Sequence, residues 1–182
     1  MAVCLHHFGL VLIDLDRWQA SGLPSTYWID LLNTLQQPCV LLWQDQWLTA
    51  QALVKARLQI KLGLFHRIHA RHTYTAKIDQ TTAEAFLQQH HLQGSTTAKI
   101  KYGLFLKKQY VQKYIHQPVL PLNDTLVAVA TFSAGRTMKW GERRNTRSYE
   151  LLRFGSLQGY VVVGGFDKLL QAFINEYPML VS

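Results

Sequence analysis

The chain combines short continuous apolar runs with longer stretches in which apolar residues recur at helical spacing. The runs of strand length predict strands at residues 9–15, 39–43, 100–106, 125–132 and 149–155, and a further strand is expected around residues 67–78. The helically spaced stretches predict helices at residues 26–37, 45–62, 81–90 and 164–176. Since strands and helices occur in mixed order, without strict βαβ alternation, the pattern predicts an α+β fold.

Capping and turn-forming residues mark some of these boundaries. Asp79 stands just before the helix at 81–90, where its carboxylate can accept hydrogen bonds from the free backbone N–H groups of the first turn. The segment between the strands at 100–106 and 125–132 is long for a hairpin and contains Pro118 and Pro121. We therefore expect that segment to be an insertion.

The composition indicates a folded, basic protein. Apolar residues make up 48% and aromatic residues 12% of the 182 residues, while charged residues make up 16%, which excludes the disordered class. Lys and Arg total 19 against 11 Asp and Glu, so the formal net charge is +8. This excess favours an anionic partner such as nucleic acid, an acidic membrane surface or a phosphorylated cofactor. Charge alone does not choose among them, and many basic proteins bind no specific anion.

The start of the chain and its hydropathy indicate a cytoplasmic location. The opening MAVCLHHFGLVLIDLD lacks the charged region and the long apolar stretch of a signal peptide. No apolar run reaches the roughly 18 residues that a membrane-spanning helix needs. We therefore expect a cytoplasmic protein with no membrane partner.

The cysteines and histidines do not predict a metal site. Cys4 and Cys39 form no C-x-x-C pair, so we interpret them as reduced thiols. His66, His69 and His72 are spaced by three, which gives a compact triad neither on a strand nor on a helix. We expect no bound metal.

Residues 83–176 contain the blocks AEAFLQQHHLQG, KYGLFL, LVAVATFSAGR, SYELLRFGS and VVVGGFDKLLQAFI in that order. This order resembles the GNAT-like domain of phage and mobile-element DNA-modification proteins, which are related to the Mom-type adenine-modification proteins. The resemblance covers about half of the chain and rests most on YELLRF together with GGFDKLLQAF. It implies a GNAT-like mixed sheet with flanking helices over residues 73–182. It also implies an acyltransferase-like DNA-modifying enzyme that moves an acyl-derived group to a nucleobase, with acetyl-CoA as the candidate cofactor.

The first 72 residues form the other expected domain, a small α/β segment. Residues 40–71 resemble the tail of a restriction-like or mismatch-nicking endonuclease fold. Such nucleases need an acidic cluster for Mg²⁺, usually with a nearby lysine. The acids present are Asp14, Asp16 and Asp45, and no Glu-x-Lys follows them. We expect an endonuclease-like remnant, with a divergent nuclease as the less favoured alternative.

Gly164 and Gly165 are the candidate cofactor-binding residues, together with Lys168. The pair follows a strand-like run and opens a helix, a setting in which backbone N–H groups and the helix dipole can hold a pyrophosphate. Lys168, one turn further on, is expected to face either a phosphate or solvent. The alternative interpretation is a tight turn with close helix packing.

His91 and Glu150 are the candidate catalytic residues. The resemblance to Mom-type proteins implies a functional histidine at a comparable early position, and an imidazole suits a general base or a metal ligand. The alternative for His91 is capping of the last carbonyls of helix 81–90. Glu150 is expected to be a buried acid in the cleft or a partner in a structural ion pair, and Arg153 to meet a phosphate or to belong to such a pair.

A basic loop supplies the candidate nucleic-acid-binding residues. Cations beside an aromatic side chain suit a phosphate backbone with a stacked base, and a solvated charged loop is the alternative. The residues are Arg136, Lys139, Trp140, Arg143, Arg144 and Arg147.

The chain end is expected to matter for assembly and activity. In the resembled proteins a further strand and a Tyr-containing helix complete the acyl-CoA cleft, whereas here the sequence stops at Ser182. An open sheet edge and the apolar tail Met179–Val181 predict a homodimer, unless the N-terminal segment covers that edge. An incomplete cleft makes a non-catalytic DNA-binding accessory protein the alternative to the transferase.

Overall fold

The computed structural model describes residues 2–5, 8–24, 26–34, 38–115, 123–139, 141 and 144–177. The expected dimerisation tail Met179–Val181 therefore lies outside the described residues. The chain divides into two compact units, unit 1 (Met1–Leu58) and unit 2 (Gln59–Ser182).

Unit 1 contains a small three-stranded sheet in which the strand order is β1-β2-β3. The first two strands are antiparallel, and the second is parallel to the third. Two short helices form the crossover between the parallel strands, and a longer helix, kinked at Ala50, follows the last strand. The elements are β1 (Ala2–Leu5), β2 (Phe8–Ile13), α1 (Leu15–Ser21), α2 (Tyr27–Thr34), β3 (Cys39–Trp43) and α3 (Gln44–Lys61).

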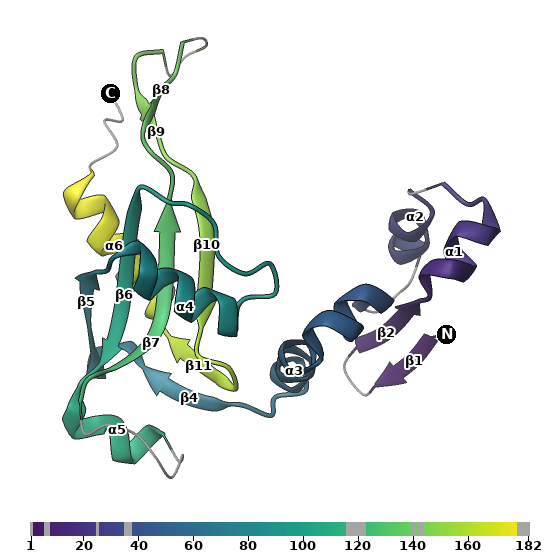
Figure 1. Ribbon diagram of the computed structural model, residues 1–182, viewed down its shortest axis with the longest axis horizontal. Coiled ribbons are helices and arrows are strands. Elements are labelled where there is room, and N and C mark those ends of the chain that lie inside the picture. Colours follow the sequence, from purple (N-terminus) through teal and green to yellow (C-terminus); the bar gives the residue numbers. More distant parts are fainter. Residues whose placement is uncertain are drawn as a thin grey trace. The chain divides into compact units, whose positions relative to one another are not determined.

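Unit 2 is built on a four-stranded antiparallel sheet in which the order is β10-β7-β6-β5. A parallel pair of strands lies at one end of this sheet, and a hairpin extends from the other end (Figure 1). The strands are β4 (His66–His69), β5 (Thr73–Lys77), β6 (Ile100–Leu106), β7 (Thr125–Phe132), β8 (Arg136–Thr137), β9 (Arg147–Ser148), β10 (Leu151–Ser156) and β11 (Tyr160–Val163). The helices are the 3₁₀ turn η1 (Ala70–His72), α4 (Gln80–His90), α5 (Lys108–Tyr114) and α6 (Gly165–Glu176). Helices and mixed sheets together confirm the α+β class.

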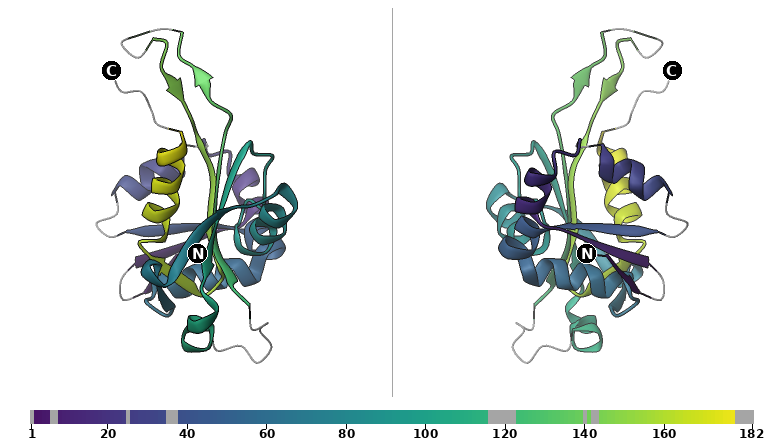
Figure 2. Two further views of the ribbon diagram at one scale, coloured as in Figure 1. Left: turned by 90° about the vertical axis from the view of Figure 1, so that its left-hand side faces the viewer. Right: turned by 90° about the vertical axis from the view of Figure 1, so that its right-hand side faces the viewer.

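Two helices cover opposite faces of the four-stranded sheet (Figure 2). Leu169 and Phe173 of α6 are buried against the cluster that contains Leu104 and Ile68. On the other face, Phe86 and Leu87 of α4 pack against Val129. The apolar positions of each helix therefore face the sheet, as their spacing predicts. Asp79 caps α4 as expected, since its Oδ1 accepts a hydrogen bond from the Thr82 N–H at 2.7 Å.

The expected strand at 67–78 is wrong as a single element. The turn η1 divides it into β4 and β5, and β5 joins the antiparallel sheet while β4 pairs in parallel with β11. The sequence placed a domain boundary after residue 72, whereas the contacts divide the chain after Leu58. β4 belongs to unit 2 because it pairs with β11 near the end of that unit, in the register His66↔Tyr160 to His69↔Val163.

Other expectations agree more closely. The strands expected at 39–43, 100–106 and 125–132 have the observed bounds of β3, β6 and β7. Helix α1 and helix α5 had no counterpart in the expected elements. Pro118 and Pro121 of the expected insertion lie outside the described residues.

A carboxylate fastens the C-terminal end of α6 to the sheet. The Glu176 carboxylate accepts hydrogen bonds from the Tyr102 hydroxyl of β6 at 2.5 Å and from the Lys77 ammonium of β5. These hydrogen bonds, that from Lys77 first, lower the pKa of Glu176 below its ordinary value of 4.5. A carboxyl whose pKa is lowered on folding stabilises the fold above its unfolded pKa, and this contribution is lost as the pH falls through the folded pKa.

We predict that Glu176→Gln lowers the free energy of unfolding at neutral pH, and that the deficit shrinks as the pH falls below 4.5. In acid the wild-type carboxyl is protonated and therefore uncharged, as the Gln amide is at every pH of the series. The free energies of unfolding of the two chains therefore converge. Urea denaturation of both chains over a pH series measures the difference, and Glu84→Gln, an exposed acid of α4, is the matched control. Parallel pH profiles for the wild type and Glu176→Gln would contradict this prediction.

Candidate functional site

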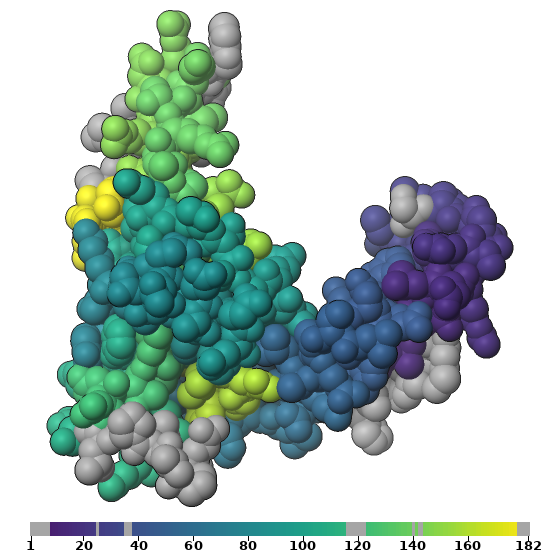
Figure 3. Space-filling model, viewed as in Figure 1, coloured from purple at the N-terminus to yellow at the C-terminus, as the bar shows by residue number. Residues whose placement is uncertain are grey.

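The basic segment predicted from the sequence is a two-stranded hairpin rather than a loop. Strands β8 and β9 pair through Arg136↔Ser148 and Thr137↔Arg147. Figure 3 shows the hairpin standing out from the rest of unit 2. Side chains directly across a ribbon share a face, so Arg136 and Arg147 lie on opposite faces. Trp140 and Arg143 lie outside the described residues.

The described cations of the hairpin are exposed, and none of them has an ion-pair partner within the described part of the chain. They are Arg136, Lys139, Arg144 and Arg147. Unpaired, solvated cations on a projecting ribbon can approach an external anion without first breaking an internal ion pair. The structure therefore brings together four of the six candidate nucleic-acid-binding residues on one element.

An aromatic contact anchors the base of this hairpin. The Tyr149 ring lies so close to Gly135 that a Cβ placed there would be 2.8 Å from the ring. The same ring packs edge-on to Phe173 of α6, with ring centroids 5.2 Å apart. Two hydrogen bonds of 2.9 Å join Ser133 and Glu150, one from each residue's N–H. The hairpin is thus fixed to the core at its base, while its cations extend into solvent.

Glu150 does not occupy the position expected of a buried acid. It lies before β10 begins and is exposed. Arg153, three residues later, donates a hydrogen bond to the Leu152 carbonyl at 2.7 Å, and its buried Nε has no hydrogen-bond partner among the described residues. Among the described residues Glu150 and Arg153 form no ion pair. The pairing of β10 with β7 has a register shift between Leu151 and Arg153.

His91 ends α4, as the capping interpretation expects, but its imidazole acts on a different group. The His91 N–H donates to the Leu87 carbonyl at 2.8 Å, which closes the last turn. The ring Nδ1 accepts a hydrogen bond from the Gln93 N–H at 3.2 Å. The ring also lies beside Gly155 of β10. His91 therefore fastens the chain that leaves α4 against the sheet.

Gly164 and Gly165 form a tight turn that lets α6 pack closely. Gly164 has φ 73°, a left-handed conformation that glycine adopts without strain, and it is the N-cap of α6. Gly165 is buried, and a Cβ there would lie 2.9 Å from Val162 and 3.2 Å from Leu104. Asp167 already places a negative charge in the first turn of α6. These observations favour the packing interpretation of the pair.

Lys168, which the sequence expected to face a phosphate or solvent, is half-buried and makes hydrogen bonds to the backbone. Its ammonium donates hydrogen bonds to the carbonyls of Ala70 at 2.9 Å and Thr73 at 2.5 Å. Partial burial, and secondarily the positive charge of Lys107, lower the pKa of Lys168. The side chain therefore joins α6 to the two ends of η1.

The three spaced histidines lie on neighbouring elements without forming a metal centre. His66 and His69 belong to β4, and His72 belongs to η1. The His72 ring stacks on Tyr110 with centroids 4.0 Å apart, and its Nδ1 lies 2.7 Å from the Tyr114 hydroxyl. Over the described ranges of the chain, no three His, Cys, Asp or Glu side chains are placed to hold a metal ion.

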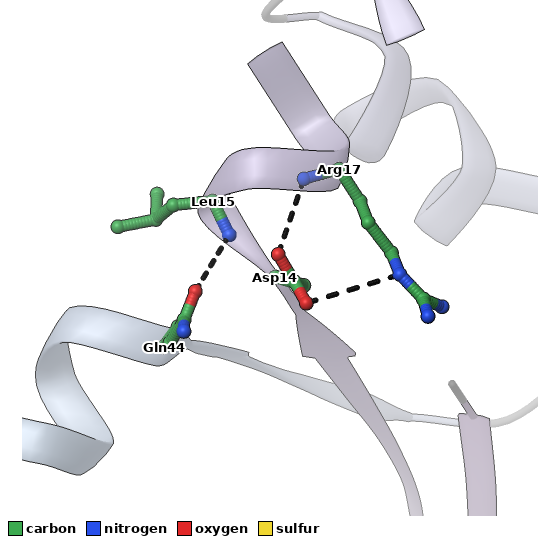
Figure 4. Close-up of polar contacts among 4 residues, drawn as sticks. All are labelled: Asp14, Leu15, Arg17 and Gln44. Atoms are coloured by element: carbon green, nitrogen blue, oxygen red, sulfur yellow. Dashed lines mark hydrogen bonds and ion pairs between the residues drawn. The ribbon is translucent and has the colours of Figure 1, made fainter. Parts of the chain in front are cut away.

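In unit 1 the acids of the expected nuclease remnant serve the local backbone. Asp14 Oδ1 accepts a hydrogen bond from the Arg17 N–H at 3.1 Å, and Gln44 Oε1 accepts one from the Leu15 N–H at 3.0 Å (Figure 4). Asp45 Oδ1 accepts one from the Gln46 N–H at 2.8 Å. The residues that directly follow β2 and β3 are Asp14 and Gln44. Both side chains accept a hydrogen bond from a backbone N–H in the first turn of α1.

Unit 1 contains a cavity of about 760 Å³ that was not predicted from the sequence. Four tryptophans line it together with aliphatic residues from β2, β3 and α3. The tryptophans are Trp18, Trp28, Trp43 and Trp47. The chain contains five tryptophans, and the crowding of four of them before residue 48 was the signal in the sequence.

The helices of the described part of the chain are all too short or too polar to cross a membrane.

We predict that Gly165→Ala destabilises the protein by about 1–3 kcal/mol, because the new methyl group would come too close to the side chains of Val162 and Leu104. Gly159→Ala is the control, since its Cβ would meet nothing within 4 Å. The control should carry only the cost of a left-handed alanine, roughly 1–2 kcal/mol. Urea denaturation measures both changes. A Gly165→Ala chain as stable as the wild type would show that the pair is not needed for packing.

Comparison with known proteins gives no relative for this chain. No family model, no curated protein and no solved structure matches it. The GNAT-like resemblance therefore rests on the residue blocks themselves, and the function has to be argued from the side chains described above.

Proposed function

We propose that this protein binds nucleic acid, with duplex DNA as the partner, through the β8–β9 hairpin. The observation that carries the proposal is the projecting ribbon whose described cations are exposed and lack ion-pair partners among the described residues. Sequence-independent affinity for DNA comes mainly from cations that neutralise phosphates and release counterions. The formal net charge of +8 supports the same class of partner.

The shape of the hairpin supports duplex DNA as the partner. A two-stranded ribbon fits the major groove of B-DNA, which is roughly 12 Å wide. Cations on both faces of the ribbon can then reach the phosphates on either side of that groove. The aromatic contact at Gly135 and Tyr149 holds the base of the ribbon against the core of unit 2.

We predict that replacing Arg136, Arg144 and Arg147 with Ala weakens binding to duplex DNA at least tenfold. The slope of log affinity against log salt should become shallower by about 0.9 for each phosphate that the variant no longer neutralises. Fluorescence anisotropy with a labelled duplex over about 50–200 mM salt measures both quantities.

A charge-matched variant separates the hairpin from the general charge of the protein. Replacing the exposed Lys61, Arg67 and Lys99 with Ala removes the same charge from other elements of unit 2. This control should bind DNA more tightly than the hairpin variant does. Equal affinities in the two variants would locate binding in the overall charge and overturn the assignment to the hairpin.

A second candidate function, acyl transfer to a nucleobase, is favoured by the way two consecutive strands part. β10 pairs with β7 and β11 pairs with β4, so over the described ranges no ladder joins β10 to β11. The GNAT-like resemblance implies an acyl-CoA cleft beside Gly164, which a further strand after the glycine-opened helix completes in the resembled proteins. His91, beside Gly155 of β10, would be the candidate base, whereas Glu150 is exposed.

For this candidate we predict that acetyl-CoA binds and that Asp167→Asn strengthens its binding. Asp167 lies in the first turn of α6, where its charge would repel a pyrophosphate held at Gly164. Isothermal titration calorimetry with acetyl-CoA tests both chains. If the folded wild type and the variant bind no acetyl-CoA, the transferase proposal fails, and the DNA-binding proposal is unaffected.

A further inference from the structure

We infer that a group of basic residues around His72, beside α5, is a second site that binds phosphate groups of nucleic acid. It lies at the end of unit 2 opposite to the β8–β9 hairpin (Figure 1). The inference rests on the proposed function in one respect, since that function names nucleic acid as the source of the phosphate. We call this group the η1 cluster, and its members are His69, Arg71, His72, Lys107 and Lys113.

Contacts between η1, the end of β6 and α5 bring the η1 cluster together. The Arg71 Nε–H donates a hydrogen bond to the His72 Nε2 atom at 3.3 Å. Lys107 directly follows β6, and its backbone N–H donates to the His72 carbonyl at 3.1 Å. On α5, the Lys113 ammonium lies 5.6 Å from the ring centroid of Tyr114, whose hydroxyl is 2.7 Å from the His72 Nδ1 atom. Residues far apart in the sequence therefore place their charges around one imidazole.

The positive charge of the η1 cluster is not balanced by an ion pair within the described part of the chain. Its Lys and Arg side chains are all exposed, and none of them has a carboxylate partner there. Asp124 already accepts hydrogen bonds from the Lys108 N–H at 2.6 Å and from the Tyr74 hydroxyl at 2.9 Å. Residues 116–122, which come soon after α5 in the sequence, include neither Asp nor Glu. Like charges without a counterion repel one another, and an external anion relieves that repulsion.

This repulsion acts on His72. Partial burial, and secondarily the positive charges of the other members of the η1 cluster, lower the pKa of His72 below its ordinary value of 6.5. Because the neutral ring accepts a hydrogen bond from Arg71 at Nε2, its proton is on Nδ1, which donates to the Tyr114 hydroxyl. Once the ring takes up a second proton, Nε2 becomes a donor as well. A phosphate oxygen would then accept hydrogen bonds from His72 and Arg71 together.

The surroundings favour nucleic acid over a membrane surface as the source of the phosphate. The His72 ring stacks on Tyr110 with centroids 4.0 Å apart, and cations beside aromatic rings suit a nucleic-acid backbone. A protein surface that inserts into a membrane interface places large apolar side chains beside its cations. In contrast, no large apolar side chain of η1 or α5 is exposed. The η1 cluster would therefore contact a different stretch of backbone from the one that the hairpin contacts.

Phosphate binding and protonation of His72 should strengthen each other. The charge of a bound phosphate favours the imidazolium form, so the pKa of His72 should rise when duplex DNA binds. Affinity should then increase as the pH falls through the pKa of the DNA-bound protein, and it should level off below the pKa of the free protein. The phosphodiester groups of DNA keep their charge over this range, so the change comes from the protein.

The ring C–H signals of the full chain report the protonation of His72 by NMR. The His72 signals are identified by their loss in His72→Gln. A titration from about pH 5 to 8 is made without DNA, with a short duplex, and with sodium chloride at matched ionic strength. The duplex should raise the pKa of His72 by more than the chloride does. The hairpin variant at Arg136, Arg144 and Arg147 should show the same rise once it is saturated with the duplex.

A charge-matched pair of variants tests the cations of the η1 cluster. Arg71→Ala combined with Lys113→Ala should weaken duplex binding at least about threefold, and the salt dependence should become shallower by about 0.9 for each phosphate lost. Lys61→Ala combined with Lys99→Ala removes the same charge from exposed positions outside the cluster, and it should weaken binding less.

A pair of histidine variants tests the coupling to pH. Between about pH 7.5 and 5.5 the gain in affinity for the duplex should be roughly two- to tenfold smaller in His72→Gln than in the wild type. His66→Gln, in which an exposed histidine of β4 is replaced, should keep the gain of the wild type.

Three outcomes would overturn the inference. The first is a DNA-bound wild-type chain in which the pKa of His72 rises no further than it does in chloride, which would leave the hairpin proposal intact. The second is equal affinity of the η1-cluster variant and its charge-matched control. The third is a larger rise with phosphatidylglycerol vesicles or with poly-glutamate than with DNA, which would assign the cluster to a membrane surface or to an acidic protein. If His72→Gln does not fold, the wild-type titration and the charge-matched pair still decide.

Discussion

The parallel pairing of β4 with β11 is the contact on which the arrangement of unit 2 depends. It joins a segment from the start of the unit to one near its end, and it lies directly before η1 and directly before α6. Because both strands continue into these elements, the pairing places α6 beside η1, where the Lys168 ammonium reaches the carbonyls of Ala70 and Thr73. The glycine pair that opens α6 follows from the same constraint, since only a residue without a side chain fits between Val162 and Leu104.

The elements that the sequence predicted best are those whose signal is local. β3, β6 and β7 are continuous apolar runs, and buried strands show themselves in that way regardless of what they pair with. The break between β4 and β5 could not be predicted, because residues 67–78 contain no glycine or proline and the turn is enforced by pairing with β11. The β8–β9 hairpin was predicted as a loop, because its short exposed strands show no alternation of apolar and polar residues.

The residues of the candidate site were likewise predicted where their signal is local and not where it depends on distant contacts. The cations of the basic segment were predicted because charge can be counted along the chain, and four of them lie together on one ribbon. The surroundings of Lys168 could not be predicted, because its hydrogen-bond partners lie almost a hundred residues earlier. Nor could the cavity, since Trp18, Trp28, Trp43 and Trp47 come together only through the crossover between two parallel strands. Glu150 was misplaced because the strand begins at Leu151, two residues later than its pattern suggested.

The separation of β4 and β11 along the chain also shapes how unit 2 folds. His66 finds its partner, Tyr160, only after the whole antiparallel sheet has been traversed. Non-local pairings of this kind form slowly, because the entropy of closing a long loop is lost before the contact compensates for it. During synthesis on the ribosome β4 therefore emerges well before β11, the strand with which it pairs. Until then the backbone N–H and C=O groups of β4 lack the partners that β11 provides, and another chain could pair with them.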